Sequence, residues 1–170
     1  FFFKQKTAYE ITYGDWSSDV CSSDLKGTIV DSVVLALQSE FPQIEGLVVN
    51  IGGDLRVAGR SRYSVSIPAP QRDALNAAPL AVLQLSNQAI ATSGMSERSM
   101  RVGNTVVSHI MDPRTARPSS DIPSASVLAA DAETADVLAT ICSVLRPAES
   151  VRLVESVPGA ACCWVTWGPR

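Results

Sequence analysis

The segment GLVVNIGGDLRVAG, residues 46–59, places an apolar run on each side of a Gly-Gly pair. The first run is rich in β-branched residues and stops at Gly52 and Gly53, and the second run continues beyond them, so both are typical of short strands. Two glycines after a strand either permit a tight turn at positive φ or let the backbone approach a ligand closely. The pattern by itself favours the turn.

The same kind of pattern predicts further strands and three helices on either side of this segment. Runs of alternating or apolar residues predict strands at 62–68, within 79–94 as one broken or two separate strands, on both sides of a turn at Gly103-Asn104, and at 124–130 and 160–167. Apolar residues at helical spacing predict helices over 26–42, 131–146 and 148–157. Strands in runs with helices at intervals predict an α+β fold, with a mixed or mostly antiparallel sheet flanked by helices.

Composition and charge exclude several classes of protein. Hydrophobic residues make up 46% of the 170 residues and charged residues 18%, which is ordinary for a globular domain. No apolar run approaches the length that a membrane helix needs. The net charge of −3 gives no electrostatic basis for binding nucleic acid. The four cysteines form neither a C-x-x-C motif nor a zinc-binding spacing, so they do not indicate a compartment.

The first 25 residues differ in composition from the rest of the chain. They contain three of the four Phe and two of the three Tyr, whereas the remainder is rich in Ala, Arg and Val. Translated backwards, KQKTAYEI and GDWSSDVCSSDL resemble a short-read sequencing adapter read in one frame. We therefore interpret residues 1–25 as an assembly artefact, with a natural disordered leader as the alternative, and expect the native sequence, residues 26–170, to enter in mid-element.

Two segments at the ends of predicted strands carry groups suited to a site. In ATSG, residues 91–94, Thr92, Ser93 and Gly94 offer short side chains and free amides that suit a phosphate or a flavin edge, although an ordinary polar turn fits equally. His109, the only histidine, ends a strand before an Asp-Pro pair whose proline cannot donate to a sheet. A lone histidine is usually a structural hydrogen-bonding group, but the neighbouring Ser, Asp and Arg favour a site here.

A possible metal site lies on the helix predicted over 131–146. Asp136 and Thr140 are four residues apart, so their oxygens share one face of that helix. A carboxylate and a hydroxyl in this arrangement can bind a hard divalent cation, with carbonyls or waters completing the shell. The plainer interpretation is a surface Asp beside an interior Thr, and the pair alone favours it.

Taken in order and spacing, these segments resemble one family, the FAD:protein FMN transferases or ApbE family. The matching segments are KG followed by Asp31, VNIGGDLRVAG, AIATSGMSER, SHIMDPRT and ADVLAT, and they span nearly all of residues 26–166. Five collinear motifs are far more specific than a single glycine loop. The resemblance implies the family's α+β fold, and it implies that residues 26–170 are the C-terminal part of the domain, truncated at the N-terminus.

The resemblance implies an enzyme that uses Mg²⁺ and FAD to attach the FMN moiety to a Thr or Ser hydroxyl of a target protein, releasing AMP. His109 is then expected to be the base that takes the proton of the acceptor hydroxyl, because imidazole has an unperturbed pKa of about 6.5. Asp136, Thr140 and the backbone carbonyl of Ala139 would hold Mg²⁺ against the pyrophosphate. The other expected contacts with the flavin nucleotide come from Lys26, Ile110, Gly52, Gly53, Thr92, Ser93 and Gly94.

The chain departs from the family pattern in two places. The family usually has glycine where this chain has Ala116, so we expect that turn to be reshaped. The family also places another metal ligand and much of the nucleotide pocket upstream of Lys26, so we expect this chain alone to be inactive. Family members are often found on the outer side of the bacterial inner membrane, and the resemblance implies the same location here.

Two other activities fit the same residues. A Mg²⁺-dependent pyrophosphatase would use water in place of the acceptor hydroxyl and cleave FAD to FMN and AMP. A flavin-binding protein without turnover would need no base, and the joint presence of His109, Asp136 and Thr140 argues against it. A nucleic-acid or purely structural module has little support, because basic patches with interleaved aromatic residues are missing.

Overall fold

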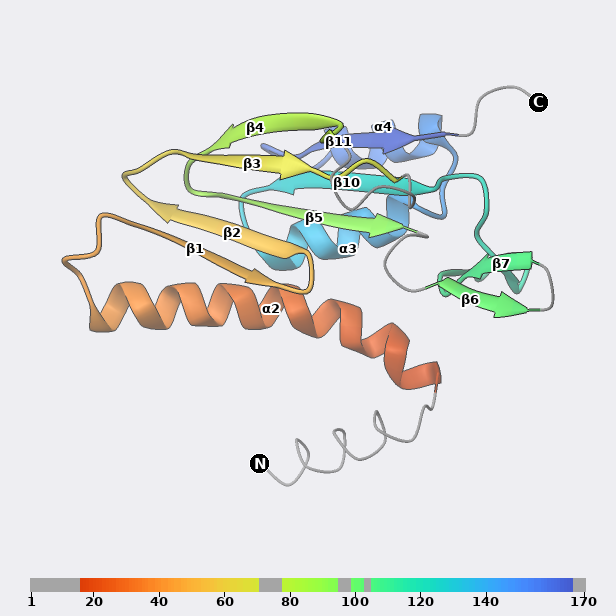
Figure 1. The fold of residues 1–170 in the computed structure, drawn as a ribbon, viewed down its shortest axis with the longest axis horizontal. Helices are drawn as coiled ribbons and strands as arrows, with labels where there is room; N and C mark the ends of the chain where they lie inside the picture. Colours follow the sequence, from red (N-terminus) through yellow and green to blue (C-terminus); the bar gives the residue numbers. More distant parts are fainter. Residues whose placement is uncertain (1–15, 71–77, 95–98, 103–104, 167–170) are drawn as a thin grey trace.

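The structure, a computed structural model, describes residues 16–70, 78–94, 99–102 and 105–166 (Figure 1). Three helices and eleven strands lie within these residues. In chain order they are α2 (Trp16–Glu40), β1 (Gly46–Ile51), β2 (Asp54–Gly59), β3 (Tyr63–Ile67), β4 (Ala81–Leu85), β5 (Gln88–Gly94), β6 (Ser99–Val102), β7 (Thr105–Ser108), β8 (Met111–Asp112), β9 (Arg117–Pro118), β10 (Ser124–Ala129), α3 (Ala132–Cys142), α4 (Pro147–Glu155) and β11 (Ala161–Val165). Among these described helices, none is long and apolar enough to cross a membrane.

The main sheet has five strands in the order β1-β2-β5-β10-β11, and every pairing is antiparallel. Hairpins β3–β4, β6–β7 and β8–β9 form separate two-stranded sheets. Strands β1 and β2 pair up to Ile51 and Asp54, and the turn between them has φ values of 59° at Gly52 and 98° at Gly53. Only glycine adopts such values freely, so the Gly-Gly pair forms the predicted turn. The α+β prediction with a mostly antiparallel sheet is confirmed.

The strand predictions on both sides of this turn are also confirmed. The stretch 79–94 contains two strands, with the chain turning at Asn87, whose φ is 50°. Strands β6 and β7 pair in register from Ser99 with Ser108 to Val102 with Thr105. The turn predicted at Gly103-Asn104 lies outside the described residues.

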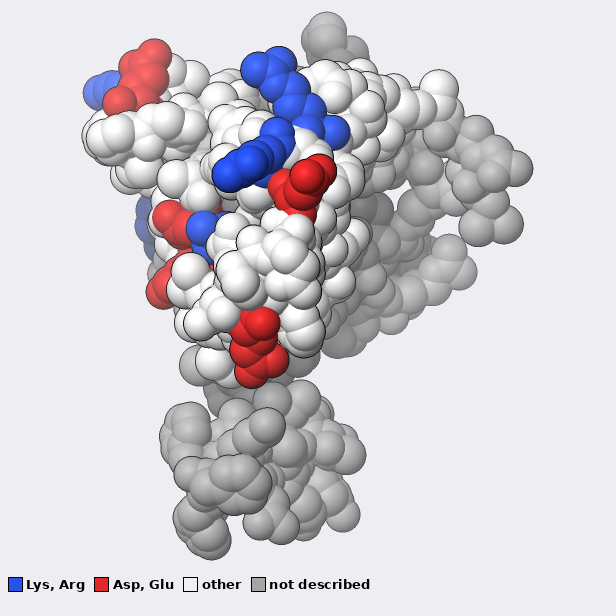
Figure 2. Space-filling model, turned by 90° about the vertical axis from the view of Figure 1, so that its left-hand side faces the viewer, with Lys and Arg blue, Asp and Glu red and all other residues white. Residues whose placement is uncertain are grey.

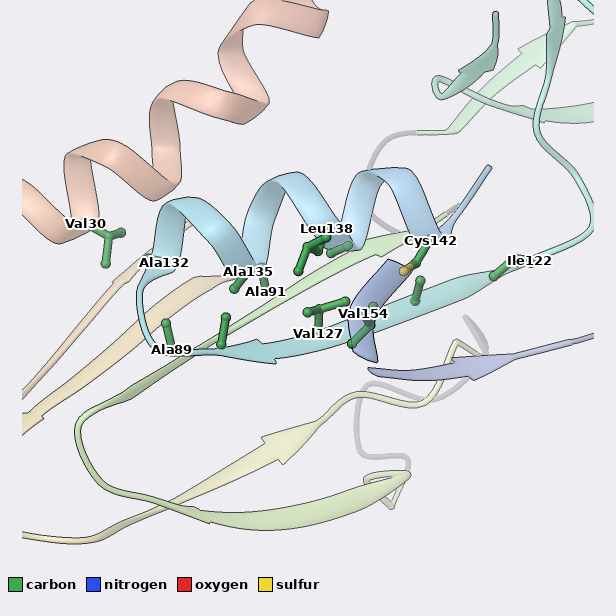
Figure 3. Close-up of a cluster of buried hydrophobic side chains, with 13 residues drawn as sticks. Val30, Ala89, Ala91, Ile122, Val127, Ala132, Ala135, Leu138, Cys142 and Val154 are labelled. Atoms are coloured by element: carbon green, nitrogen blue, oxygen red, sulfur yellow. The ribbon is translucent and has the colours of Figure 1, made fainter. Parts of the chain in front are cut away.

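The principal core lies between the main sheet and α3 (Figure 3). Helix α3 contributes small side chains to it, among them Ala135, Ala139 and Cys142, and these meet residues of β5 and β10. The apolar spacing that predicts the helix over 131–146 puts larger residues such as Val137 and Ile141 on its inward face as well, but they are only half-buried. Small inward residues let the helix lie close to the sheet, which brings polar groups on both into contact. The helix ends at Cys142, earlier than the predicted Arg146.

The opposite face of the main sheet is covered by the β3–β4 hairpin (Figure 1). A second cluster of buried residues joins them: Val57, Ile67, Leu85 and Ile90. Because successive residues of a strand point to opposite faces, β5 places alternate side chains toward α3 and toward this hairpin. Strand β5 therefore contributes side chains to both hydrophobic clusters.

Helix α2 confirms the helix predicted at 26–42, but it begins at Trp16, inside the segment that we interpret as foreign. It packs against α3 and the β1–β2 hairpin. It lies close to the start of α3 at Gly27, where an added Cβ would lie 2.6 Å from the Ala132 carbonyl oxygen. Val30 and Val34 are fully buried, whereas Ile29 and Val33 are exposed.

Candidate functional site

Lys26 lies against the Gly-Gly turn between β1 and β2. Its Nζ is 2.7 Å from Oδ2 of Asp54, a carboxylate that is 2% exposed. An added Cβ at Gly52 would lie 3.4 Å from Cδ of Lys26, so the lysine stem runs beside this turn. The structure therefore brings together two of the predicted nucleotide-binding residues, Lys26 and Gly52. Sequence reasoning did not identify Asp54, which follows the glycines directly and holds the lysine.

The hydroxyl groups of Thr92 and Ser93 lie on opposite faces of β5. Ser93 Oγ is 3.2 Å from Thr140 Oγ1 on α3, and this contact is a hydrogen bond between the strand and the helix. Thr92 Oγ1 is 2.8 Å from Ser126 Oγ, its register partner on β10. Adjacent residues of the ATSG motif therefore belong to different environments, and Ser93 is the one that meets the predicted metal-binding residues.

Gly94 ends β5 where the strand passes close to the chain before β10. A Cβ at this position would lie 2.5 Å from the carbonyl oxygen of Pro123. The glycine is thus needed for the approach of two backbone segments. Backbone packing alone therefore explains why this position is a glycine, whether or not the residue also contacts a nucleotide.

Asp136, Ala139 and Thr140 lie on consecutive turns of α3. Asp136 is 2% exposed and Thr140 is half-buried against Ser93. The Ala139 carbonyl accepts a hydrogen bond of 3.1 Å from the backbone N–H of Ser143 and retains a second lone pair. Carboxylate, hydroxyl and carbonyl oxygens are the ligands that Mg²⁺ prefers, so the residues present fit this ion chemically. No group of three His, Cys, Asp or Glu that could hold a metal occurs among the described residues, so a metal would depend on such mixed oxygens.

The loop that carries His109 is fastened to the end of α3. Arg114 donates from Nε and Nη2 to the two carboxylate oxygens of Asp112 at 2.9 and 3.0 Å, and its Nη2 also donates to the Val144 carbonyl at 3.0 Å. Ser119 Oγ donates to the Ser143 carbonyl at 2.6 Å. These contacts join residues on both sides of the loop to the chain just after Thr140.

The electrostatics of this loop are set by the ion pair between Asp112 and Arg114. The Arg114 guanidinium lowers the pKa of Asp112 below its usual value, mainly through its side-chain hydrogen bonds. The carboxylate therefore stays charged near neutral pH, and this ion pair, which we call the Asp112–Arg114 clamp, stays formed. His109 is exposed and Ile110 half-buried. The Ile110 N–H donates to Ser108 Oγ at 3.1 Å, and its carbonyl accepts from Ser119 N at 2.8 Å.

A cavity of about 250 Å³ opens on the hairpin side of the sheet. Its lining combines polar and apolar residues: Asn50, Gly53, Leu55, Val65, Ser66, Pro68, Ile90 and Thr92. It includes two predicted nucleotide-binding residues, Gly53 and Thr92, but none of the predicted metal-binding residues. The predicted site residues thus fall into a set around this cavity and a set where β5 meets α3.

Asp31, part of the KG…D motif, has a role that the sequence did not reveal. Its two carboxylate oxygens accept hydrogen bonds from the N–H groups of Ala132 and Glu133, each at 3.0 Å, and Oδ1 also accepts from Arg56 Nη1 at 2.5 Å. A carboxylate at a helix N-terminus satisfies free N–H groups and complements the helix dipole. Asp31 therefore fixes the start of α3, the helix that carries Asp136 and Thr140. A partner about a hundred residues away gives no local sequence signal.

Charges on the surface are mixed in sign. Figure 2 shows one side of the molecule, on which both acidic and basic side chains are present and lie beside one another in places. Arg114, Arg146 and Glu149 form such a mixed cluster, with Arg146 Nη2 2.7 Å from Glu149 Oε1. Exposed pairs of this kind contribute little to stability and create no strong field for an anionic polymer.

Known proteins resemble this chain in sequence and fold. Residues 21–164 match the model of the ApbE family. The FAD:protein FMN transferase of Treponema pallidum (strain Nichols) is 30% identical over 143 residues, 79% of this chain and 40% of the relative, and that of Vibrio cholerae serotype O1 is 33% identical over 140 residues, 79% and 41%. The crystal structure of the ApbE protein from Thermotoga maritima superposes with a TM-score of 0.73 at 28% identity, over 85% of this chain and 47% of that one. The chain thus spans about two fifths of the curated relatives it matches.

Proposed function

This chain belongs to the ApbE family, and we propose that its site serves the Mg²⁺-dependent transfer of the FMN moiety of FAD to a Thr or Ser hydroxyl of a target protein. The observation that carries the proposal is the contact between Ser93 and Thr140, which joins the ATSG motif to the predicted metal-binding helix. Two motifs 47 residues apart in sequence thereby meet at one polar junction. The curated relatives of the chain reported above bear the name FAD:protein FMN transferase.

Asp136, Thr140 and the Ala139 carbonyl would hold the Mg²⁺ ion. When bound, the ion would offset negative charge on the phosphates of FAD. Ser93 would orient the Thr140 hydroxyl through their hydrogen bond, leaving the other lone pair of Thr140 for the ion. Asp31 and Gly27 support this arrangement from α2, because they fix where α3 begins.

His109 would take the proton of the acceptor hydroxyl. As that oxygen bonds to the FMN phosphorus, the P–O bond to AMP breaks and AMP leaves. The exposed position of the imidazole suits a base that must meet a protein substrate from outside. The Asp112–Arg114 clamp would limit the motion of the loop that carries it.

The flavin nucleotide would contact residues on both sides of β5. Lys26 would add positive charge near the phosphates while Asp54 holds its ammonium group. The further contacts would come from Ile110, Gly52, Gly53, Thr92, Ser93 and Gly94. The partner would be a flavin-acceptor protein, and we place the reaction on the outer side of a bacterial inner membrane on family grounds alone.

The test uses a chimera in which this chain supplies the segment that matches the Treponema pallidum relative. FAD and Mg²⁺ are added with and without a target protein that carries an acceptor Thr, and flavin on the target is followed by mass spectrometry and fluorescence. Transfer to the target with release of AMP supports the proposal. Release of FMN and AMP without transfer would favour the pyrophosphatase, and FAD binding without turnover a non-catalytic flavin protein.

The matched variants are Thr140→Val and Arg117→Ala. Thr140→Val keeps the shape of the side chain but removes the hydroxyl, and we expect at least about a tenfold loss of transfer. Arg117 is exposed on β9, eight residues after His109, and has no assigned role, so its replacement should leave transfer unchanged. Equal activity of Thr140→Val and the parent chimera would contradict the assigned metal site.

A further inference from the structure

Two of the cysteines lie on the same face of the main sheet. Cys142 is the last residue of α3, is fully buried, and belongs to the principal core (Figure 3). Cys162 on β11 is the register partner of Val127 on β10, and Val127 belongs to the same core. Because partners in an antiparallel pair project to the same face of a sheet, Cys162 points to the face that α3 covers. It packs against the core and is half-buried.

The side chains of Cys142 and Cys162 are in direct contact. A hydrogen bond joins the two groups, and both are free thiols. The next residue, Cys163, is the register partner of Ser126 and is exposed. Successive residues of a strand point to opposite faces, so Cys163 lies on the other side of the sheet from Cys142. Of the two adjacent cysteines of β11, only Cys162 is placed to reach Cys142.

We propose that Cys142 and Cys162 form a redox site that closes an intramolecular disulfide between the end of α3 and β11. Thiols already in contact need only a small movement to reach the geometry of a disulfide. The bond closes a loop that contains α4, and closing a loop removes conformational freedom mainly from the unfolded chain, which stabilises the folded one. The inference rests on strand register, contact and burial, and not on the proposed reaction.

The oxidant is itself a disulfide, for which oxidised glutathione serves as the probe, and the reaction is thiol–disulfide exchange. The half-buried Cys162 sulfur bonds to one sulfur of the oxidant and releases the other as a thiol. The Cys142 sulfur then bonds to that of Cys162 and releases the second half of the oxidant. Two protons pass from the cysteines to the two released thiols, and the oxidant is reduced. Burial raises the pKa of both cysteines, which slows the exchange but does not set its equilibrium.

Equilibrium with glutathione tests the site. Cys21, in the segment that we interpret as foreign, is replaced by serine throughout, and the whole chain is held at several ratios of oxidised to reduced glutathione, with and without urea. After acid quenching, cleavage after Arg152 separates Cys142 from Cys162, and fragmentation mass spectrometry identifies linked pairs. We expect a disulfide between Cys142 and Cys162 whose equilibrium constant is at least about tenfold larger in the folded chain than in urea, because the fold holds the two thiols together.

The adjacent cysteines of β11 supply matched variants. Cys163→Ser should form the disulfide as the parent does, whereas Cys162→Ser should leave Cys142 unlinked to any other cysteine. Circular dichroism verifies that each variant is folded, and the comparison of the parent with and without urea depends on neither variant. Linkage of Cys142 to Cys163, or an equilibrium constant in the folded chain no larger than in urea, would overturn the proposal.

Unfolding in urea gives a second readout. The oxidised chain should unfold at a urea concentration about 1 M higher than the reduced chain, because the bond constrains the unfolded state. Cys162→Ser should unfold at the same urea concentration in oxidising and in reducing buffer. An oxidised parent that unfolds at the same urea concentration as the reduced parent, or at a lower one, would show that the bond does not fit the junction of α3 and β11 and would refute the proposal.

Discussion

Ala116 has a φ of 52°, in the left-handed region that glycine enters without steric cost. Its N–H still donates to the Asp112 carbonyl at 2.8 Å, so the turn forms despite the side chain. The family pattern has glycine here, and the structure shows the physical reason for that preference. A turn closed by this hydrogen bond therefore forms with alanine at this position.

Ala116→Gly should therefore stabilise the chain by about 0.5–1 kcal/mol, because the Cβ strain in the left-handed region is relieved at the cost of some chain entropy. Urea unfolding followed by circular dichroism measures the change. Ala148→Gly, at an exposed position within α4, is the matched control and should destabilise by a similar amount. If both variants lose stability equally, the backbone of residue 116 does not have the conformation described.

Cys162 on β11 lies against the buried Cys142 at the end of α3. Burial, with smaller contributions from neighbouring groups, raises the pKa of Cys162 from 9.0 to about 11. Burial likewise raises the pKa of Cys142. Both thiols therefore stay protonated at neutral pH, and the contribution of Cys162 to stability is lost as the pH rises from about 9 toward 11.

Cys162 should consequently react with a thiol reagent about a hundredfold more slowly in the folded chain than in urea at pH 8, since only the thiolate is nucleophilic. Mass spectrometry of labelled peptides over time measures this ratio. Cys163, which is exposed on the other face of β11, serves as the internal control for access. A folded-state rate for Cys162 equal to its rate in urea would show that the thiol is not buried as described.

At the scale of elements, the junction of α2 and α3 determines where the candidate metal-binding residues lie. Gly27 permits close contact, and Asp31 accepts from two N–H groups at the start of α3. Replacing glycine by alanine within a helix normally stabilises the helix. At Gly27, however, the added methyl group would lie 2.6 Å from a backbone oxygen. The steric clash should outweigh the gain in helix propensity.

We expect Gly27→Ala to destabilise the chain by about 1–3 kcal/mol, as overpacking against backbone usually does. The free energy of unfolding in urea gives the value. Ser39→Ala, at an exposed position near the end of the same helix, should change it by less than about 0.5 kcal/mol. Stabilisation by Gly27→Ala would mean that the two helices do not touch at this point.

The sequence predicted the elements well where the signal is local. The Gly-Gly turn and a possible break between two strands within 79–94 were readable from neighbouring residues. The start of the helix predicted over 131–146 was also right, because Asp131 caps α3 by accepting a hydrogen bond from Thr134 N at 2.8 Å. The inward face of α3 was not, because small residues such as Ala135 and Ala139 carry a weak hydrophobic signal although they are fully buried.

The candidate site was readable only in part, for a related reason. The motif residues were identified by family resemblance, and the structure shows that Lys26 meets Gly52 and that Ser93 meets Thr140. Alternation along a strand places Thr92 and Ser93 on opposite faces of β5, but the sequence did not provide which of the two faces α3. The interpretation of residues 1–25 as an assembly artefact stays a prediction that rests on their composition and on their resemblance to an adapter.

At the scale of the whole molecule, we propose that the polar junction of β5 and α3 binds Mg²⁺ and FAD and that the loop held by Arg114 brings His109 to them. In this proposal, binding and proton transfer belong to different segments, α3 with β5 and the loop after β7. Binding and transfer should therefore separate when each segment is altered alone. A single packed core with incidental polar residues would not behave in this way.

The most direct measurement compares FAD binding and FMN transfer by the chimera after His109→Ala and after Asp136→Asn. Calorimetry with and without Mg²⁺ gives the affinity for FAD, and flavin on the target protein gives transfer. We predict that His109→Ala retains Mg²⁺-dependent FAD binding but loses transfer by about a hundredfold or more, whereas Asp136→Asn loses both. Transfer at the parent rate by His109→Ala, or Mg²⁺-dependent binding unchanged by Asp136→Asn, would contradict it.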